Sequence, residues 1–232
     1  METIYELFHQ LREWLNPKII IETLLAKGGV FVYVGLVLIV FAETGLAAGF
    51  FLPGDSLLVV AGLFAANGKL SLTILLSTLF VSAVIGDTVG YYTGQKIGPR
   101  IFSRQESLFF KPSHLLKAHA FYEKYGGKTI VIARFIPFVR TFAPIVAGAA
   151  QMPYRNFIFF NVAGGFLWVF SMILSGYFLG SLLKSKFGID LDEHIEWVVI
   201  IVVALSLMPP VIEYWRSRRE KARAARALNP SA

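Results

Sequence analysis

The chain of 232 residues contains no cysteine. This absence excludes disulfide bonds, thiolate zinc sites and catalysis by a thiol, and it removes the usual sequence indicator of redox compartment. Charged residues are also few, at 16% of the chain against about 25% in an average soluble domain. Apolar residues make up 56%, where about 45–50% is average. The composition therefore excludes a disordered chain and disfavours an ordinary cytosolic domain.

Sequence motifs of common enzyme classes are missing as well. The chain has no glycine-rich phosphate loop ending in Lys-Ser/Thr and no Gly-x-Ser-x-Gly elbow. All four histidines lie outside the long apolar stretches, and His114 and His119 lack the spacing and the intervening glutamate of a helical zinc site. We therefore expect a protein that is not an enzyme, with no catalytic residue, metal or cofactor.

Long apolar stretches predict an all-α integral membrane protein. A transmembrane helix needs about 20 apolar residues, and four stretches meet that requirement, namely 29–49, 70–94, 157–183 and 195–215. Segment 1–28 lacks the pattern of a signal peptide and carries apolar side chains at helical spacing up to residue 15, which indicates an amphipathic helix in the membrane interface. A similar pattern predicts a second interfacial helix over 111–125. The membrane domain then covers 29–215.

Two further apolar stretches, 50–68 and 129–154, are interrupted by proline, glycine and charge. Irregular backbone at membrane depth is tolerated only where protein or a wet cavity satisfies its polar groups. These stretches predict two re-entrant hairpins, each entering and leaving the membrane on one side. The residues that we assign to their turns and breaks are Pro53, Gly54, Pro137, Pro144 and Gly148.

The distribution of basic residues predicts the orientation in the membrane. Six basic residues between 216 and 226 follow the last apolar stretch, so we interpret 216–232 as a cytoplasmic tail on anionic lipid headgroups rather than a nucleic-acid site. If 129–154 is re-entrant, the loop 95–128, with seven basic and two acidic residues, lies on the same side. Both termini are then cytoplasmic, and the two hairpins enter from opposite faces.

The two predicted hairpins resemble each other weakly in sequence. Val60-Ala61-Gly62 matches Val146-Ala147-Gly148, and each triplet is followed seven residues later by a basic residue, Lys69 and Arg155. Opposed broken segments in corresponding positions are typical of transporters with inverted repeats and a site near the midplane. Chance similarity between apolar segments is the alternative.

Five charged side chains lie at predicted membrane depth: Glu43, Asp55, Asp87, Arg134 and Arg140. Each costs roughly 2.5–3.5 kcal/mol to insert unless it is paired or hydrated. Arginine stays protonated, so the two arginines require acceptors. Three carboxylates against two arginines leave one carboxylate without a partner. Because burial disfavours the charged form of a carboxyl group, that residue is a candidate to carry a proton.

These charges have two interpretations. Arg134 and Arg140 are six residues apart on a proline-broken segment, where they could clamp a phosphate in bidentate fashion. The alternative is a purely structural role, in which static salt bridges hold the hairpins together. Asp87 fits a proton relay or a static pair equally well, and Asp55 fits either a site residue or a cap of the helix after Pro53.

Several residues together carry a family resemblance. They are Glu43, the run Phe51-Leu52-Pro53-Gly54-Asp55, Gly86-Asp87 with Tyr91, Tyr92 and Gly94, and the block from Arg134 to Thr141 with Pro144 and Ala147-Gly148. Over roughly residues 20–215 the chain resembles the DedA family of bacterial membrane proteins and the wider VTT-domain group, which includes eukaryotic lipid scramblases. The resemblance implies an inner-membrane protein that moves a phosphorylated lipid, with undecaprenyl phosphate as the implied cargo and a link to proton motive force. The family's functionally required acids and arginines fall on Glu43, Asp55, Arg134 and Arg140.

The leading hypothesis is therefore a lipid-phosphate flippase of the bacterial inner membrane. Arg134 and Arg140 bind the phosphate, Glu43, Asp55 and Asp87 exchange protons or cations, and the lipid tail stays in the membrane. The expected partners are the lipid phosphate, membrane lipids and protons, with no nucleic acid. A homo-oligomer is possible. The alternatives are a proton-coupled antiporter for small solutes or cations, and a scaffold that transports nothing.

Overall fold

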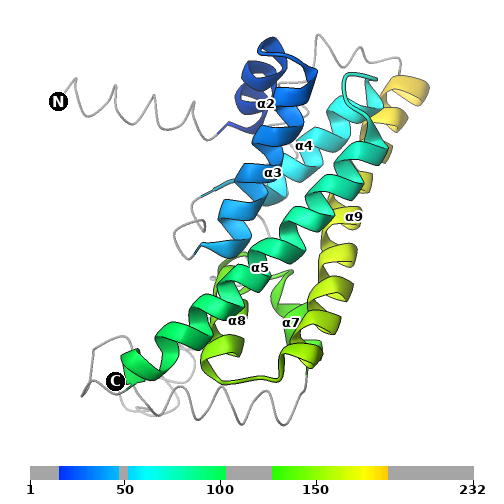
Figure 1. The fold of residues 1–232 in the computed structure, drawn as a ribbon. Coiled ribbons are helices and arrows are strands. Elements are labelled where there is room, and N and C mark those ends of the chain that lie inside the picture. The colour runs from blue at the N-terminus through cyan, green and yellow to red at the C-terminus, as the bar shows by residue number, and fades with distance from the viewer. Residues whose placement is uncertain (1–15, 47–51, 103–126, 188–232) are drawn as a thin grey trace, which may run out of the picture.

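The computed structural model describes residues 16–46, 52–102 and 127–187. Every regular element in these ranges is an α-helix (Figure 1): α2 (Pro17–Ala26), α3 (Gly29–Gly45), α4 (Gly54–Ala66), α5 (Leu72–Phe102), α7 (Lys128–Ala133), α8 (Pro137–Ala149) and α9 (Tyr154–Phe187). The described part of the chain thus confirms the α-helical class. The predicted span 195–215, the interfacial helices up to residue 15 and over 111–125, and the tail 216–232 lie outside the described residues.

Two helices, α5 and α9, are long and apolar enough to cross a membrane. They contain 31 and 34 residues. Helix α5 begins two residues after the predicted start of span 70–94 and continues eight residues beyond its end, while α9 extends beyond the predicted span 157–183 at both ends. The stretch 29–49 forms the shorter helix α3 of 17 residues, which ends at Gly45 because the backbone becomes extended at Leu46. The helix therefore ends four residues before the predicted end of the span at residue 49.

The N-terminal segment contains one helix that the sequence interpretation did not single out. Asn16 caps α2 by accepting a hydrogen bond from the backbone N–H of Lys18 at 3.0 Å, and Pro17 occupies the first helical position. Proline suits that position because its missing N–H would have no intrahelical partner there. The Asn16-Pro17 pair therefore starts a helix.

The helices form two halves that run in opposite directions (Figure 1). In the first half, α4 leads to one end of the molecule, the chain turns at Gly68 with a φ of 76°, and α5 returns along the whole length. In the second half, α8 leads to the opposite end, the chain turns at Gln151 with a φ of 55°, and α9 returns. This arrangement agrees with the weak inverted repeat in the sequence.

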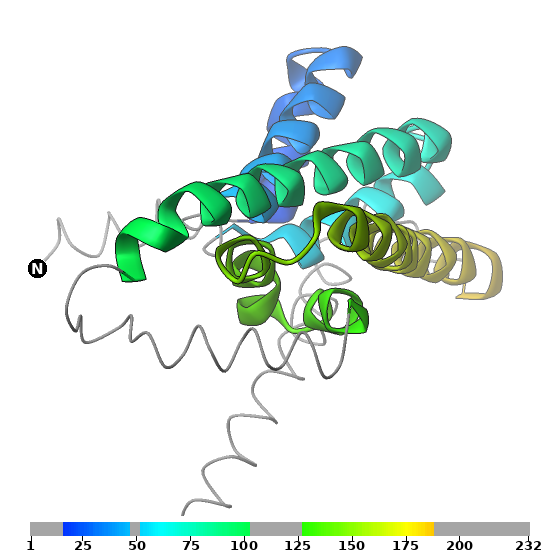
Figure 2. The ribbon, with the colours of Figure 1, turned by 60° about the horizontal axis from the view of Figure 1, so that its bottom comes forward.

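Each short helix packs against the long helix of the other half, α4 on α9 and α8 on α5. Figure 2 shows α8 beside the C-terminal part of α5 from a second direction. At the first crossing, a Cβ atom on Gly62 would overlap the carbonyl oxygen of Ile173, and one on Gly176 would overlap that of Val59. Small residues allow such close backbone approach between membrane helices.

The second crossing repeats this geometry. A Cβ atom on Gly148 would overlap the carbonyl oxygen of Tyr91, and one on Gly94 would overlap that of Ile145. Gly62 and Gly148 are the equivalent glycines of the sequence repeat. The same position therefore makes the same kind of contact in both halves. The first turns of α4 and α8 lie near each other, because Asp55 of α4 pairs with Arg140 of α8.

The outer surface of the bundle is apolar. Large hydrophobic side chains are exposed along α3, α5 and α9, among them Phe31, Leu38, Val81, Phe166 and Phe178. A surface of this kind suits contact with lipid.

The glycine crossings yield a stability prediction. Gly176→Ala puts a methyl group against the Val59 backbone, and overpacking of this kind costs about 1–3 kcal/mol. We expect a lower melting temperature for the purified protein in detergent. The matched control is Gly29→Ala, because a Cβ atom at Gly29 meets nothing within 4 Å. Equal melting temperatures for the two variants would contradict the close α4–α9 contact.

Candidate functional site

The five charges at predicted membrane depth converge on one layer in the interior. They come from α3, α4, α5 and α8 and from the residue that follows α7. Glu43, Asp87 and Arg134 are at most 3% exposed, Arg140 is 8% exposed, and the Asp55 side chain is 21% exposed. The layer contains two separate clusters, each built around one arginine.

The first cluster surrounds Arg140 in the first turn of α8. Its Nη2 atom pairs with Glu43 Oε1 from α3, and its Nη1 atom pairs with Asp55 Oδ1 from α4. These partners are 97 and 85 residues away in the sequence. Glu43 and Asp55 thus lie on one shared guanidinium.

Gly54 makes room for this cluster at the start of α4. A Cβ atom on Gly54 would overlap Glu43 Oε2, so any other residue would push the carboxylate away from Arg140. Asp55 does not cap α4, because no side-chain hydrogen bond caps that helix. The capping interpretation of Asp55 is therefore wrong, and its carboxylate binds Arg140 instead.

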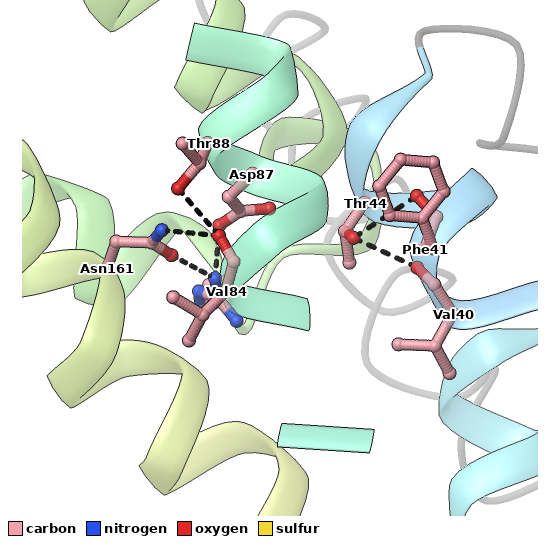
Figure 3. A network of polar contacts seen from close by, with 8 residues as sticks. Val40, Phe41, Thr44, Val84, Asp87, Thr88 and Asn161 are labelled. Carbon is pink, nitrogen blue, oxygen red and sulfur yellow. Dashed lines mark hydrogen bonds and ion pairs between the residues drawn. The ribbon is translucent and has the colours of Figure 1, made fainter. Parts of the chain in front are cut away.

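The second cluster surrounds Arg134, directly after α7. Its Nη2 atom pairs with Asp87 Oδ2 from α5 and donates to Asn161 Oδ1 from α9. Figure 3 shows Asn161 reaching toward α5, where its Nδ2 atom donates to the carbonyl oxygen of Val84 at 3.0 Å. The fully buried Asn161 thus ties Arg134 to both long helices.

The expectation of one carboxylate without an arginine is wrong. All three carboxylates contact a guanidinium, because Glu43 and Asp55 share Arg140 while Asp87 pairs with Arg134. The surplus negative charge lies in the Arg140 cluster, which holds two carboxylates against one arginine. The two arginines share no hydrogen-bond acceptor among the described residues.

One face of α9 contacts both clusters and was missed in the sequence. Asn161, Gly164, Gly165 and Trp168 follow the spacing of one helical face. A Cβ atom on Gly164 would lie 3.0 Å from Arg134 Cδ, and one on Gly165 would lie 3.1 Å from Arg134 Nη1. The available signal was an asparagine followed by a Gly-Gly pair inside an otherwise apolar span.

Some guanidinium donors in the layer have no acceptor among the residues that the structure describes. Arg134 Nε, Arg134 Nη1 and Arg140 Nε are buried and make no hydrogen bond within the described part of the chain. Buried donors without a partner are unfavourable and rare in native proteins. Guanidinium donors of this kind suit an anionic acceptor. Among the described residues no group of three His, Asp or Glu side chains could hold a metal ion.

Comparisons with known proteins identify the family of this chain. Residues 52–178, more than half of the chain, match the VTT domain family. Protein DedA of Escherichia coli (strain K12) is 41% identical over 228 residues, covering 97% of this chain and 100% of that protein. The chain belongs to the DedA family of membrane proteins. The matched region includes Asp55, Asp87 and both arginines, while Glu43 precedes it.

Other relatives support a membrane location for this DedA-family protein. An uncharacterized membrane protein of Mycobacterium leprae (strain TN) is 39% identical over 189 residues, 82% of each chain. Inner membrane protein YqjA of Escherichia coli (strain K12) is 33% identical over 188 residues, covering 80% of this chain and 85% of that protein. No solved structure shows a significant match.

The different partners of the arginines yield a second prediction. Asp87→Asn leaves Arg134 without a charged partner among the described residues, and breaking a buried ion pair in this way costs about 3–5 kcal/mol. Asp55→Asn leaves Arg140 paired with Glu43, so we expect a smaller loss. Thermal unfolding in detergent measures both.

The combination of Asp87→Asn with Arg134→Gln serves as the control, because it removes the unpaired charge. We expect the double variant to regain part of the stability that Asp87→Asn loses. A double variant no more stable than Asp87→Asn would contradict an electrostatic origin of the effect.

Proposed function

We propose that this DedA-family protein is a transporter that moves a phosphorylated lipid across the membrane. The observation that carries the proposal is the buried layer in which two arginines pair with carboxylates and keep donors that have no acceptor among the described residues. In the proposed cycle a lipid phosphate replaces carboxylates on Arg134 and Arg140. The proposal is a transport function and not an enzymatic one, so it assigns no residue a role in bond chemistry.

A phosphate monoester fits the donors of this layer. Guanidinium groups bind phosphate through paired N–H donors, and the interaction strengthens where water is excluded. The N-terminal ends of α4 and α8 also lie at the layer, with Asp55 and Arg140 in their first turns. Half-helix N-termini carry partial positive charge and are typical anion sites in transporters with broken helices.

The charge balance of the layer supports coupling to protons or cations. Three carboxylates and two guanidinium groups sum to −1. A phosphate monoester adds about −1.5 to −2 at neutral pH. Burying that much charge is very unfavourable, so entry of the phosphate requires uptake of protons or cations by Glu43, Asp55 or Asp87. The Arg140 cluster, with its surplus carboxylate, is the first place for such uptake.

The shape of the protein suits a lipid with a long tail. Helices α4 and α8 have 13 residues each, about 20 Å at about 1.5 Å per residue, against about 30 Å of membrane core. We therefore assign them to re-entrant hairpins that enter from opposite faces, with both chain termini cytoplasmic. The tail remains in lipid along the apolar outer surface, and family resemblance names undecaprenyl phosphate of the bacterial inner membrane as cargo.

A second candidate function is a proton-coupled antiporter for small solutes or cations. The observation that favours it is the pair of carboxylates on Arg140, because a cation or proton could replace one guanidinium contact without any anion entering. In that case the arginines are structural partners and lipid phosphate is not moved.

Transport in liposomes tests the proposal. We expect the purified protein to move a fluorescently labelled polyprenyl phosphate between leaflets, and Arg140→Ala to reduce the rate to that of protein-free liposomes. Arg140→Lys should lower it at least about tenfold, because lysine lacks the bidentate fork. Arg155→Ala, which removes an exposed arginine at the start of α9, is the matched control. Two results would contradict the proposal. One is an Arg140→Lys variant that transports the lipid at the wild-type rate, and the other is a folded wild-type protein that transports no lipid.

Coupling is tested in the same liposomes under an imposed pH gradient. We expect the gradient to change the rate of lipid movement in the wild type, since phosphate entry requires charge compensation. Glu43→Gln removes one titratable group of the Arg140 cluster, so its rate should respond less. An identical response of Glu43→Gln and wild type would remove Glu43 from the coupling pathway.

A further inference from the structure

Trp168 on α9 contacts both arginine clusters although it carries no charge. Its ring centroid lies 4.9 Å from Arg140 Cζ and 6.0 Å from Arg134 Cζ. The side chain is 1% exposed, so these cation–π contacts are shielded from solvent, where they are strongest. A buried tryptophan therefore lies beside the two side chains to which the proposed function assigns the phosphate.

The indole N–H of Trp168 has a specific acceptor. Trp168 Nε1 donates to Asp55 Oδ1 at 2.8 Å, and the same oxygen pairs with Arg140 Nη1. Buried indole N–H groups normally find a partner, and a charged acceptor makes a stronger bond than a neutral one. One ring thus touches the guanidinium with its face and the carboxylate with its N–H.

The rest of this α9 face fixes Arg134 in the same way. Asn161 accepts from Arg134 Nη2, while Gly164 and Gly165 leave room for the Arg134 side chain one turn before Trp168. Because these residues share one long helix, α9 sets the position of both arginines relative to each other. Sites held on rigid elements in this way keep their geometry when a ligand exchanges.

The geometry has a consequence for the exchange step. When an entering phosphate takes the donors of Arg140, Asp55 loses its guanidinium partner. The indole N–H remains as a donor to Asp55, and the ring face remains beside Arg140. Trp168 can therefore hold both members of the exchanging pair in place while their direct contact is broken.

We propose that Trp168 is the positioning residue of the arginine layer, retaining Asp55 through its N–H and Arg140 through its ring while the phosphate replaces the carboxylate. This inference rests on the proposed function, because it names the side chain that governs how the same site exchanges its ligands. The indole itself does not bind the phosphate.

Three variants in the liposome assay separate the two contacts. Trp168→Phe keeps a ring but removes the N–H, and we expect the transport rate to fall about tenfold. Trp168→Leu removes both contacts, and we expect a fall of about a hundredfold. Phe157→Leu, which replaces another fully buried aromatic of α9 that stacks on Tyr91, is the control and should change the rate less than about twofold. Equal rates for Trp168→Leu and Phe157→Leu would overturn the proposal.

A spectroscopic measurement needs no transport and decides the outcome even if these variants fail to fold. The chain has four tryptophans, so replacing Trp14, Trp197 and Trp215 by phenylalanine leaves Trp168 as the single reporter in the full chain. We expect Asp55→Asn and Arg140→Gln each to shift its emission, and Arg155→Gln to leave it unchanged. In the same protein, farnesyl phosphate should shift the emission and farnesol should not.

The two failures are distinguishable. Emission that responds to Asp55→Asn and Arg140→Gln in a protein that moves no polyprenyl phosphate would refute the lipid-phosphate function and keep the contacts of Trp168. If neither substitution shifts the Trp168 emission, the positioning role of Trp168 would be overturned, whatever the transport rate.

Discussion

Two guanidinium groups that cannot lose their charge, buried at the centre of an apolar helix bundle, set the constraint on which the rest of this structure depends. Arg134 and Arg140 need acceptors, and the protein supplies Asp87 and Asn161 to one and Glu43 and Asp55 to the other. These acceptors come from four helices, so the helices must converge on one layer. The fold is the arrangement that makes this convergence compatible with close packing.

Glycine permits that convergence. At both crossings of a short helix with a long one, backbones approach so closely that a Cβ atom on either partner would overlap a carbonyl oxygen. The crossings bring the first turns of α4 and α8, which carry Asp55 and Arg140, into contact. Breaking each half into a short and a long helix therefore serves the site directly, because an unbroken span would carry these residues past the layer.

The sequence predicted the members of the site better than their pairing. Charge at membrane depth was enough to select all five ionisable residues, and Pro53-Gly54 was enough to locate the start of α4. Pro137 was assigned only to a break in the second hairpin, and it is the first residue of α8. The pairing of Arg140 with Glu43 was not predictable, because it depends on how helices 97 residues apart in the chain pack together. Trp168 and Asn161 were missed for a related reason: within an apolar span an uncharged side chain is conspicuous only once its neighbours are known.

The two arginine clusters differ in a way that matters for function. Arg134 has one carboxylate and a neutral amide, whereas Arg140 has two carboxylates and an indole N–H that supports one of them. The Arg140 cluster therefore carries the surplus negative charge, and one face of α9 contacts both arginines. In the proposed function, an anion that enters the layer would displace carboxylates from these arginines.

The proposed function requires that a lipid phosphate exchanges with carboxylates on these arginines. Calorimetric titration of the purified protein in detergent with farnesyl phosphate and with farnesol tests this exchange, because the two probes differ only in the phosphate. We expect saturable binding of farnesyl phosphate that is lost in Arg140→Gln, and no saturable binding of farnesol. Equal binding of the two probes, or binding of farnesyl phosphate that persists in Arg140→Gln, would contradict it.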